Sequence, residues 1–403
     1  MEKFALVKTA ARNLYEALGT ACTKHTEHQA HFSLQPVWQG QDPHVRFSIA
    51  FRHLTVNHLS GDRPMWFQVE SVVTGSIHKA LPNVTRHATP TLQSLKRPRE
   101  SSPATREKTL EKRTKKSVRF RSVSPPIPTT VESIAPTLQN LCVHNNFCNQ
   151  LQNFLTRADL KLGPNCCIGF LEHSPESKHL VYLDSRAQSV SCGPRSNTVS
   201  LMELFAVLQK QRLASGAAFS PFDRVRLAKQ LATAVLQFHA TPWLKGSWRS
   251  SDIYLYGVDY SSFHEISSTN EPYLNVSVKG PHGPASRSST LPSRTLVRNS
   301  LLFGLGVMLL ELAHEAPLRS LQRDGDVDAN DQNTEYFTAD RVRMSTSKTL
   351  GSRYAEAARK CIQCDFGHGS DLNDPALQEC FYRDVVCELE ESERKLRELD
   401  LGS

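Results

Sequence analysis

The segment FDRVRLAKQLATAVLQFHATPWLKGSWRSSDIYLY, residues 222–256, contains a helix, a loop and a strand around which the rest of the chain is arranged. Its apolar residues recur three and four positions apart, which predicts one buried helix face. These residues are Val225, Leu227, Ala228, Leu231, Ala232, Val235 and Phe238. Because a residue before proline avoids the helical region, Pro242 predicts a helix end near His239 or Ala240. The β-rich run Ile253–Tyr256 predicts a short strand.

The composition is that of a globular protein with a large polar segment. Of 403 residues, 39% are hydrophobic, and the longest apolar run, Leu301–Leu312, is shorter than the roughly 20 residues that cross a bilayer. No membrane span is expected, and the charged residue Glu16 in the first helical pattern argues against a signal peptide. Ten cysteines without a framework spacing indicate reduced thiols, so we expect a cytoplasmic or nuclear protein.

The positive charge is concentrated in one segment. Between Lys79 and Arg121 there are thirteen Lys and Arg against three Glu, a local net charge of +10, whereas the whole chain carries +8. Pro, Ser and Thr dominate this part and apolar residues are isolated, so it cannot bury enough surface to offset its ordering entropy. We predict that residues 79–136 form a disordered basic insert.

Outside this insert, hydrophobic periodicity predicts both helices and strands. Helices are predicted over 2–24, 138–155, 201–213, 301–314, 354–364 and 375–401, and strands over 31–34, 45–51, 66–73, 167–171 and 180–183. We expect a flexible joint at 214–220, an irregular segment at 259–292 and an acidic loop at 324–332.

The order of these elements resembles that of a protein kinase. The closest local match is Gly304–Leu312, GLGVMLLEL, which is similar to the central helix of the kinase large lobe, and Tyr354–Ile362 resembles a later kinase helix. The resemblance implies an α+β, two-lobed kinase-like fold, with a small strand-rich lobe and a larger, mainly helical lobe. The small lobe would comprise residues 1–78 and 137–198, on either side of the insert, and the large lobe residues 199–403.

The chain also resembles an uncharacterised domain family of filamentous fungi, often found with prion-inhibition (HeLo-type) helical domains. The shared residues are Leu236, Phe238, His239, Thr241, Pro242, Trp243, Leu244, Asp252, Ile253, Tyr254 and the run Cys361–Gly367. The likeness covers most of 1–75 and 135–395. Because little precedes the first predicted helix, we expect no membrane-acting or prion-type activity.

The kinase resemblance does not extend to the catalytic groups. Placing Ile253 on the strand after the catalytic loop puts Lys245, Gly246 and Ser247 at the His-Arg-Asp positions, so no carboxylate is available as the base. Asp252 falls at the position of the metal-binding asparagine and is able to hold a cation by itself.

Other parts of the phosphotransfer machinery are also missing. The metal-binding Asp-Phe-Gly should precede the helix at Leu301, but the chain has this triplet only at 365–367, beyond that helix. Leu301 itself stands where the central helix of kinases begins with Asp, the predicted helix 138–155 holds no Glu, and no glycine-rich phosphate loop precedes a strand. We therefore predict a catalytically inactive interaction module without a cofactor. The alternatives are a divergent phosphotransferase using Asp252 and a nuclear adaptor acting through the insert.

The loop of the opening segment is predicted to be structural. His239, Pro242, Trp243 and Trp248 are expected to belong to this structural loop, in which Trp243 and Leu244 plug the large lobe. A ligand pocket lined by the two tryptophans and Tyr254 is the less favoured interpretation.

A zinc site is a weakly supported interpretation of the run Cys361–Gly367 and the histidine that follows it. It would use Cys361, Cys364 and His368, but only half of a two-pair spacing is present. We therefore expect no metal there, because buried Cys more often acts as a small hydrophobe.

The insert carries short motifs for partners. A candidate nuclear-localisation signal consists of Lys96, Arg97, Arg99, Lys112, Arg113, Lys115 and Lys116, although a solvated basic tether fits equally well. The residues Lys116, Val118 and Phe120 are similar to a docking motif for type-one protein phosphatase, which would add a strand to its partner's sheet. Ser102 and Ser124 precede prolines and are candidate phosphorylation sites. No specific nucleic-acid binding is expected, because no aromatic residues interleave the basic ones.

Overall fold

The computed structural model describes residues 1–22, 27–38, 44–51, 64–73, 139–143, 147–156, 166–174, 177–184, 198–215, 219–256, 271–279, 296–329, 331 and 333–401. The described stretches belong to one compact unit, which the chain forms from both sides of residues 77–137. The predicted disordered insert, 79–136, lies outside the described residues.

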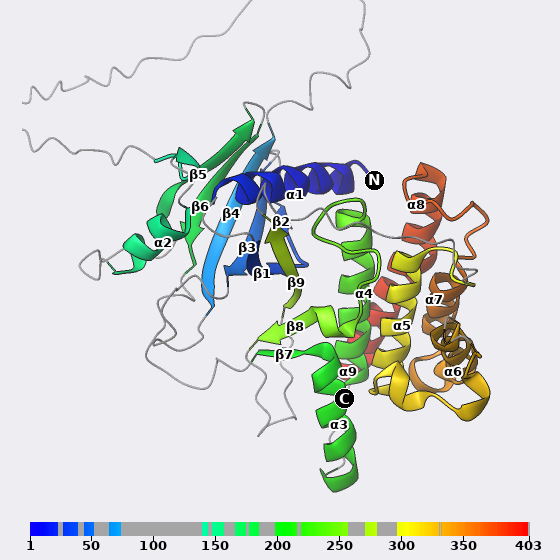
Figure 1. Cartoon of the computed structure of the whole chain (residues 1–403). Coiled ribbons are helices and arrows are strands. Elements are labelled where there is room, and N and C mark those ends of the chain that lie inside the picture. Colours follow the sequence, from blue (N-terminus) through cyan, green and yellow to red (C-terminus); the bar gives the residue numbers. More distant parts are fainter. Residues whose placement is uncertain are drawn as a thin grey trace, which may run out of the picture. The chain divides into compact units, whose positions relative to one another are not determined.

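An antiparallel sheet forms the first layer of this unit (Figure 1). The strands run in the order β5-β6-β4-β3-β1-β9-β8-β7, and β2 pairs with β3 alone. Their bounds are β1 Glu27–Ser33, β2 Val37–Trp38, β3 His44–Phe51, β4 Met65–Val73, β5 Cys167–Ser174, β6 Ser177–Leu183, β7 Thr198–Ser200, β8 Ile253–Tyr256 and β9 Pro272–Lys279. The strands predicted for the small lobe therefore share one sheet with β7, β8 and β9 from the predicted large lobe.

One face of the sheet is covered by helix α1, Glu2–Thr20 (Figure 1). Its buried side chains include Val7, Ala10, Ala11 and Leu14, which recur at the helical spacing that an amphipathic helix needs. They pack into a core that contains Phe32 of β1 and other aromatic residues of the same sheet face. The rings of Phe32 and Phe47, for example, lie 5.3 Å apart.

The helical layer is organised around α4, Pro221–Phe238, and α5, Ser300–His314. The side chain of Ser220 caps α4 by accepting a hydrogen bond of 3.1 Å from the backbone N–H of Asp223. Asn299 caps α5 in the same way through Leu302. The other helices are α2 Phe147–Thr156, α3 Leu201–Ser215, α6 Thr334–Leu350, α7 Ser352–Gln363, α8 Pro375–Phe381 and α9 Glu388–Leu401, with a π-helical segment, Tyr382–Cys387, joining the last two.

Most of the predicted elements are confirmed within a few residues. Helix α4 ends at Phe238 with His239 as its C-cap, and β8 has the predicted bounds. The predicted helix at 2–24 is confirmed but ends at Thr20. The predicted closing helix is confirmed except that its middle turn is π-helical.

Three predictions about elements are wrong. The segment predicted as irregular contains β9, which pairs with both β1 and β8. Helix α6 was not predicted at all. The predicted helix at 138–155 begins only at Phe147, because Asn140 instead bridges to Phe170 of β5 and Leu141 donates a backbone hydrogen bond of 2.7 Å to the same residue.

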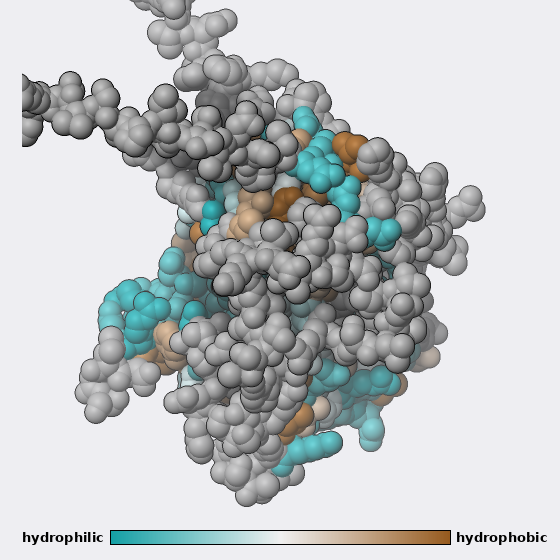
Figure 2. Space-filling model, turned by 90° about the vertical axis from the view of Figure 1, so that its left-hand side faces the viewer, coloured by the Kyte–Doolittle hydropathy of each residue, from teal (hydrophilic) through white to brown (hydrophobic). Residues whose placement is uncertain are grey.

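The α+β class is thus confirmed, whereas the two-lobed kinase-like arrangement stays a prediction. In the part of the chain that the structure describes, no helix combines the length and apolarity that a membrane crossing requires. Figure 2 shows one side of the unit, on which the coloured residues form separate hydrophilic and hydrophobic areas.

Candidate functional site

The loop after α4 is anchored by the buried side chain of Trp243. Its indole nitrogen donates a hydrogen bond of 2.7 Å to the backbone oxygen of Ala11 in α1. Its ring stacks on Phe32 of β1, with ring centres 4.0 Å apart, and meets the edge of Tyr15 at 5.2 Å. Trp243 therefore joins α1, the sheet and the loop, and it is 0% exposed. The predicted structural role of this residue fits its surroundings, whereas a ligand pocket does not.

His239 connects the end of α4 to α1 through polar contacts. Its Nδ1 lies 3.0 Å from the backbone oxygen of Val235, and its Nε2 lies 2.8 Å from Lys8 Nζ and 3.3 Å from the side-chain nitrogen of Gln378. A neutral ring that carries its proton on Nδ1 satisfies all three contacts. Burial, followed by the charge of Lys8, lowers the pKa of His239, and burial lowers the pKa of Lys8. Both ring nitrogens are thus engaged inside the protein.

Trp248 attaches the second half of the loop to α5. Its indole nitrogen donates a hydrogen bond of 3.0 Å to the backbone oxygen of Leu301. Helix α5 approaches closely because Gly304 has no side chain: a Cβ there would lie 2.6 Å from the backbone oxygen of Trp248. Leu301 stands where the resemblance places the aspartate that pins a kinase catalytic loop. In this chain a tryptophan and a backbone carbonyl make that connection.

Asp252 caps a short 3-10 turn, Ser250–Asp252, that precedes β8. Its carboxylate accepts a hydrogen bond of 2.9 Å from the backbone N–H of Arg249. The guanidinium of Arg249 forms a two-point ion pair with Glu335 of α6, at 2.9 Å for each contact. One carboxylate oxygen of Asp252 therefore accepts a backbone hydrogen bond. This capping role explains why an aspartate stands here without a bound cation.

Ser247 is exposed at the position that the resemblance gives to the catalytic base. It follows Lys245 and Gly246, which are also exposed, and Pro242 is exposed as well. A serine hydroxyl without a neighbouring base does not take up a proton at neutral pH. This stretch of loop therefore offers no group able to act as the base of phosphoryl transfer.

Strand β9 lies against β1 along its whole length. Seven pairs join the two strands, from Glu27 opposite Lys279 to Ser33 opposite Tyr273. In a kinase, the strand before the metal-binding Asp-Phe-Gly belongs to the large lobe and faces the bound nucleotide. In this chain that strand ends with Lys279, which carries a positive charge where the resemblance requires a metal-binding carboxylate nearby.

Aromatic side chains gather on the sheet face opposite α1. Trp66 of β4 contacts Tyr256 of β8 and Tyr273 of β9, with ring centres 4.5 and 5.1 Å away, and the two tyrosine rings are 5.3 Å apart. His31 of β1 stacks with Tyr254 at 4.5 Å and hydrogen-bonds to the hydroxyl of Tyr256. We call Trp66, Tyr256, Tyr273, His31 and Tyr254 the aromatic cluster. The members of the aromatic cluster lie far apart in the sequence, and the pairing of β9 with β1 and β8 brings them together, so no sequence motif marks the cluster.

Glu70 is the charged neighbour of the aromatic cluster on the same sheet face. Its two carboxylate oxygens contact His44 Nδ1 at 2.8 Å and Arg46 at 3.0 Å. The hydrogen bonds from Arg46 and His44 outweigh the effect of burial and hold the pKa of Glu70 below its usual value. These three side chains satisfy one another, so this carboxylate is not set up as a proton acceptor.

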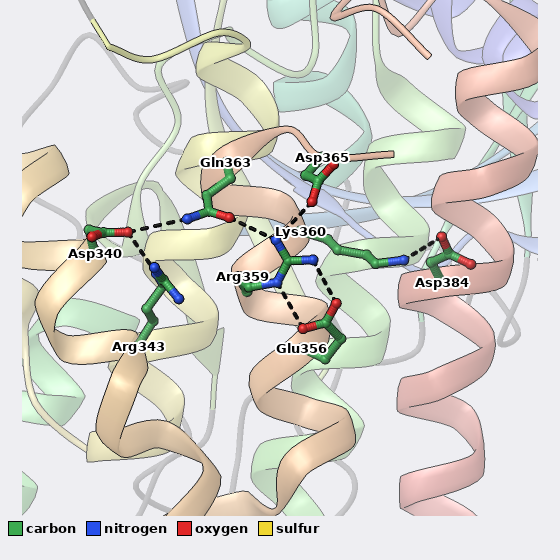
Figure 3. Close-up of polar contacts among 8 residues, drawn as sticks. All are labelled: Asp340, Arg343, Glu356, Arg359, Lys360, Gln363, Asp365 and Asp384. Carbon is green, nitrogen blue, oxygen red and sulfur yellow. Dashed lines mark hydrogen bonds and ion pairs between the residues drawn. The ribbon is translucent and has the colours of Figure 1, made fainter. Parts of the chain in front are cut away.

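The triplet Asp365-Phe366-Gly367 directly follows Cys364, the C-cap of α7, and Figure 3 shows its first residue, Asp365. Asp365 accepts a hydrogen bond of 2.8 Å from Arg359, which also binds Glu356 and the side-chain oxygen of Gln363. The ring of Phe366 packs on Phe381 at 5.8 Å. This Asp-Phe-Gly is part of a surface ion network and has no contact with the loop at 242–252 among those described.

Figure 3 shows that the same network continues to the neighbouring helices. Gln363 donates to Asp340 of α6, which also binds Arg343, and Lys360 donates a hydrogen bond of 2.8 Å to Asp384. Hydrogen bonds from Arg359 lower the pKa of Asp365 and of Glu356. The network therefore fixes the contacts among α6, α7 and the π-helical segment.

The three weak zinc candidates do not share one site. Cys361 is buried in α7, and Cys364 is the left-handed C-cap of that helix, with its sulfur 3.9 Å from the backbone oxygen of Gly369. His368 is exposed. Burial raises the pKa of the Cys361 thiol. Within the described ranges, these residues do not form a group with the spacing of metal ligands.

The candidate motifs of the insert all lie outside the described residues. They are the nuclear signal (Lys96, Arg97, Arg99, Lys112, Arg113, Lys115 and Lys116), the phosphatase motif (Lys116, Val118 and Phe120) and the phosphorylation sites Ser102 and Ser124. They stay predictions from the sequence.

Comparison with known proteins shows the family of the chain. No curated protein matches the chain. A model of the family described as a domain of unknown function, DUF7580, matches residues 128–395, which is more than half of the 403 residues and includes α2, β5 to β9 and the loop anchored by Trp243. The chain belongs to the DUF7580 family.

Proposed function

We propose that this protein is a catalytically inactive, two-lobed kinase-like module that acts by binding other proteins. The order of its elements and the position of α5 support the kinase-like part of the proposal. By resemblance to the filamentous-fungal proteins, its role is regulatory, in signalling or in self/non-self response, and it works in the cytoplasm or the nucleus.

The pairing of β1 with β9 is the observation that carries the proposal. A nucleotide bound between two lobes needs a space between the sheet of the small lobe and the strand that leads to the metal-binding aspartate. Here those two strands are hydrogen-bonded neighbours, and Trp66 packs across them onto Tyr256 and Tyr273. In the proposed kinase-like arrangement, the aromatic cluster would stand where the base of a nucleotide binds.

The loop chemistry gives independent support. Phosphoryl transfer depends on a base, metal-binding carboxylates and a phosphate-binding lysine, each placed by the fold. By the kinase resemblance, Ser247 stands at the position of the catalytic base, and the carboxylate of Asp252 accepts a hydrogen bond from the backbone N–H of Arg249. The loop has instead become an anchor that ties α1, α4 and α5 together through Trp243 and Trp248.

A thermal-shift experiment tests whether the protein retains a nucleotide-binding site. A ligand that binds the folded state raises the melting temperature by mass action. We expect Mg²⁺-ATP to leave the melting temperature unchanged at concentrations that stabilise an active kinase. A rise that saturates with ATP concentration and disappears in Asp252→Ala would favour the divergent phosphotransferase.

The partner-binding part of the proposal is tested with the insert. The insert, with its net charge of +10 and its short motifs, is the working part only in the alternative of a nuclear adaptor. We expect the chain without residues 80–130 to fold, as judged by its melting temperature, and to keep the partners that bind the folded module. Loss of partner binding on this deletion would favour the nuclear adaptor.

A further inference from the structure

Two cysteines and a histidine meet at the junction of three elements of the described unit. Cys22 directly follows the C-cap residue of α1, His28 lies near the start of β1, and Cys148 is the second residue of α2. Their possible ligand atoms all lie within 4.8 Å of one another. Cys148 and Cys22 are separated by 126 residues in the sequence, so only the fold brings them together.

The distances fit a tetrahedral metal ion. The sulfur atoms of Cys22 and Cys148 are 3.6 Å apart, and the sulfur of Cys148 is 3.7 Å from each ring nitrogen of His28, so the ring must turn to point one nitrogen at an ion. A tetrahedral zinc ion with Zn–S bonds of about 2.3 Å and Zn–N bonds of about 2.0 Å places its sulfur ligands about 3.8 Å apart and sulfur and nitrogen about 3.5 Å apart. The observed spacings therefore leave room for the ion with small side-chain adjustments.

We propose that Cys22, His28 and Cys148 bind one structural zinc ion. Two thiolates and a neutral imidazole around Zn²⁺ form a site of zero net charge, which is compatible with its burial. Cys22 is 1% exposed, Cys148 2% and His28 9%. The fourth tetrahedral position is taken by water or by a further donor of the chain.

The zinc ion would fix the return of the chain after the insert. Helix α2 is attached at its first residue, where the backbone N–H of Phe147 donates a hydrogen bond of 3.1 Å to Ala21 and the Phe147 ring packs on Phe51 at 5.9 Å. A metal bond from the adjacent Cys148 to Cys22 and His28 locks this junction. Because the three ligands come together only in the folded chain, the binding free energy of the ion adds to the stability of the folded state.

Zinc explains the three residue types better than two other interpretations. A packed thiol pair would account for the buried sulfurs, but it does not require an imidazole beside them. The Cys361 and Cys364 pair, for comparison, is packed in α7 without such a group. A disulfide between Cys22 and Cys148 would not explain why His28 lies beside the sulfur of Cys148. The site is independent of the proposed kinase-like function.

Metal analysis of the full chain tests the proposal. The protein is produced with added zinc, freed of any histidine tag, and measured by plasma mass spectrometry after dialysis. We expect about one zinc ion per chain, and much less than one in Cys22→Ser and Cys148→Ser. Cys166→Ser, which changes a cysteine outside the cluster, should keep the full zinc content. Wild-type protein without zinc, or with one equivalent of another metal, would overturn the proposal.

A cobalt spectrum of the wild-type protein tests the proposal even if the cysteine variants fail to fold. Cobalt(II) added to metal-free protein should give thiolate charge-transfer bands and the intense visible bands of a tetrahedral ion, and zinc should abolish them. A spectrum like that of aqueous cobalt would overturn the proposal regardless of how the variants behave.

Discussion

The indole nitrogen of Trp243 donates a hydrogen bond of 2.7 Å to the backbone oxygen of Ala11, 232 residues away in the sequence. This bond connects the first helix of the chain to the loop that would carry the catalytic groups of a kinase. The buried ring of Trp243 is consequently part of the core, and it fixes this end of the loop to α1.

Trp243→Ala should destabilise the protein strongly. The substitution removes a fully buried ring that stacks on Phe32 and leaves the Ala11 oxygen without this donor. We expect the free energy of unfolding, measured by urea denaturation, to fall by about 3–5 kcal/mol. Ser247→Ala, four residues along the same loop, should change it by less than about 0.5 kcal/mol, because Ser247 is exposed. Equal effects of the two substitutions would contradict the anchoring role of Trp243.

Gly304→Ala tests the close contact between α5 and the loop. A methyl group there would lie 2.6 Å from the backbone oxygen of Trp248, which cannot move without shifting the loop. Alanine favours a helix over glycine by about 1 kcal/mol, but overpacking costs about 1–3 kcal/mol, so a net loss of stability is expected. Gly325→Ala is the matched control, because its added Cβ meets nothing within 4 Å. A more stable Gly304→Ala protein would show that α5 does not press on the loop.

His239 should make the stability of the protein depend on pH. Burial and Lys8 lower the pKa of His239 in the folded state. As the pH falls through about 6.5, His239 becomes protonated in the unfolded chain but resists protonation in the folded one, so stability is lost on acidification. Its contribution is up to about 1.4 kcal/mol per pH unit in the range where only the unfolded state is charged.

The variant His239→Gln isolates this contribution. Urea denaturation between pH 7.5 and 5.5 should show a shallower loss of stability than in the wild type, although the variant is less stable at pH 7.5 because the contact with Lys8 changes. His368→Gln, at an exposed histidine, is the matched control and should keep the wild-type slope. Parallel curves for His239→Gln and the wild type would refute a buried neutral His239.

Val118→Ala combined with Phe120→Ala should weaken binding to type-one protein phosphatase in the full chain. The docked strand would bury these two side chains in its partner, and losing them should reduce affinity at least about tenfold. Thr114→Ala in the same segment is the control and should bind like the wild type. Unchanged affinity of the double variant for the purified phosphatase would exclude this motif as its docking site.

Local patterns were enough to predict the elements that have strong periodicity and clear ends. Helix α4 has an uninterrupted apolar face, Ser220 and Pro221 at its start and Pro242 beyond its end, and the structure follows these signals. The prediction that the catalytic groups are missing also comes from local sequence, because it depends only on which residues occupy motif positions, and it stays a prediction.

Elements stabilised mainly by distant partners could not be predicted in the same way. Strand β9 carries a local signal, because Leu274, Val276 and Val278 alternate with polar residues, but the surrounding segment is rich in Ser and Pro and was predicted as irregular throughout. Its main partner, β1, lies far away in the sequence. Helix α6, TEYFTADRVRMSTSKTL, contains many Ser and Thr residues and few buried positions. The aromatic cluster and the group of Cys22, His28 and Cys148 depend on such long-range pairing, so neither appears as a motif.

The most direct test of the account is phosphoryl transfer itself. Purified full-length protein is incubated with Mg²⁺ and γ-labelled ATP, alone and with general protein substrates, beside an active kinase as a positive control. Because the proposal assigns Ser247 to the base position and the aromatic cluster to the nucleotide position, we predict no transfer above the background of protein-free reactions. Stoichiometric or faster transfer that is lost in Asp252→Ala would contradict the central claim.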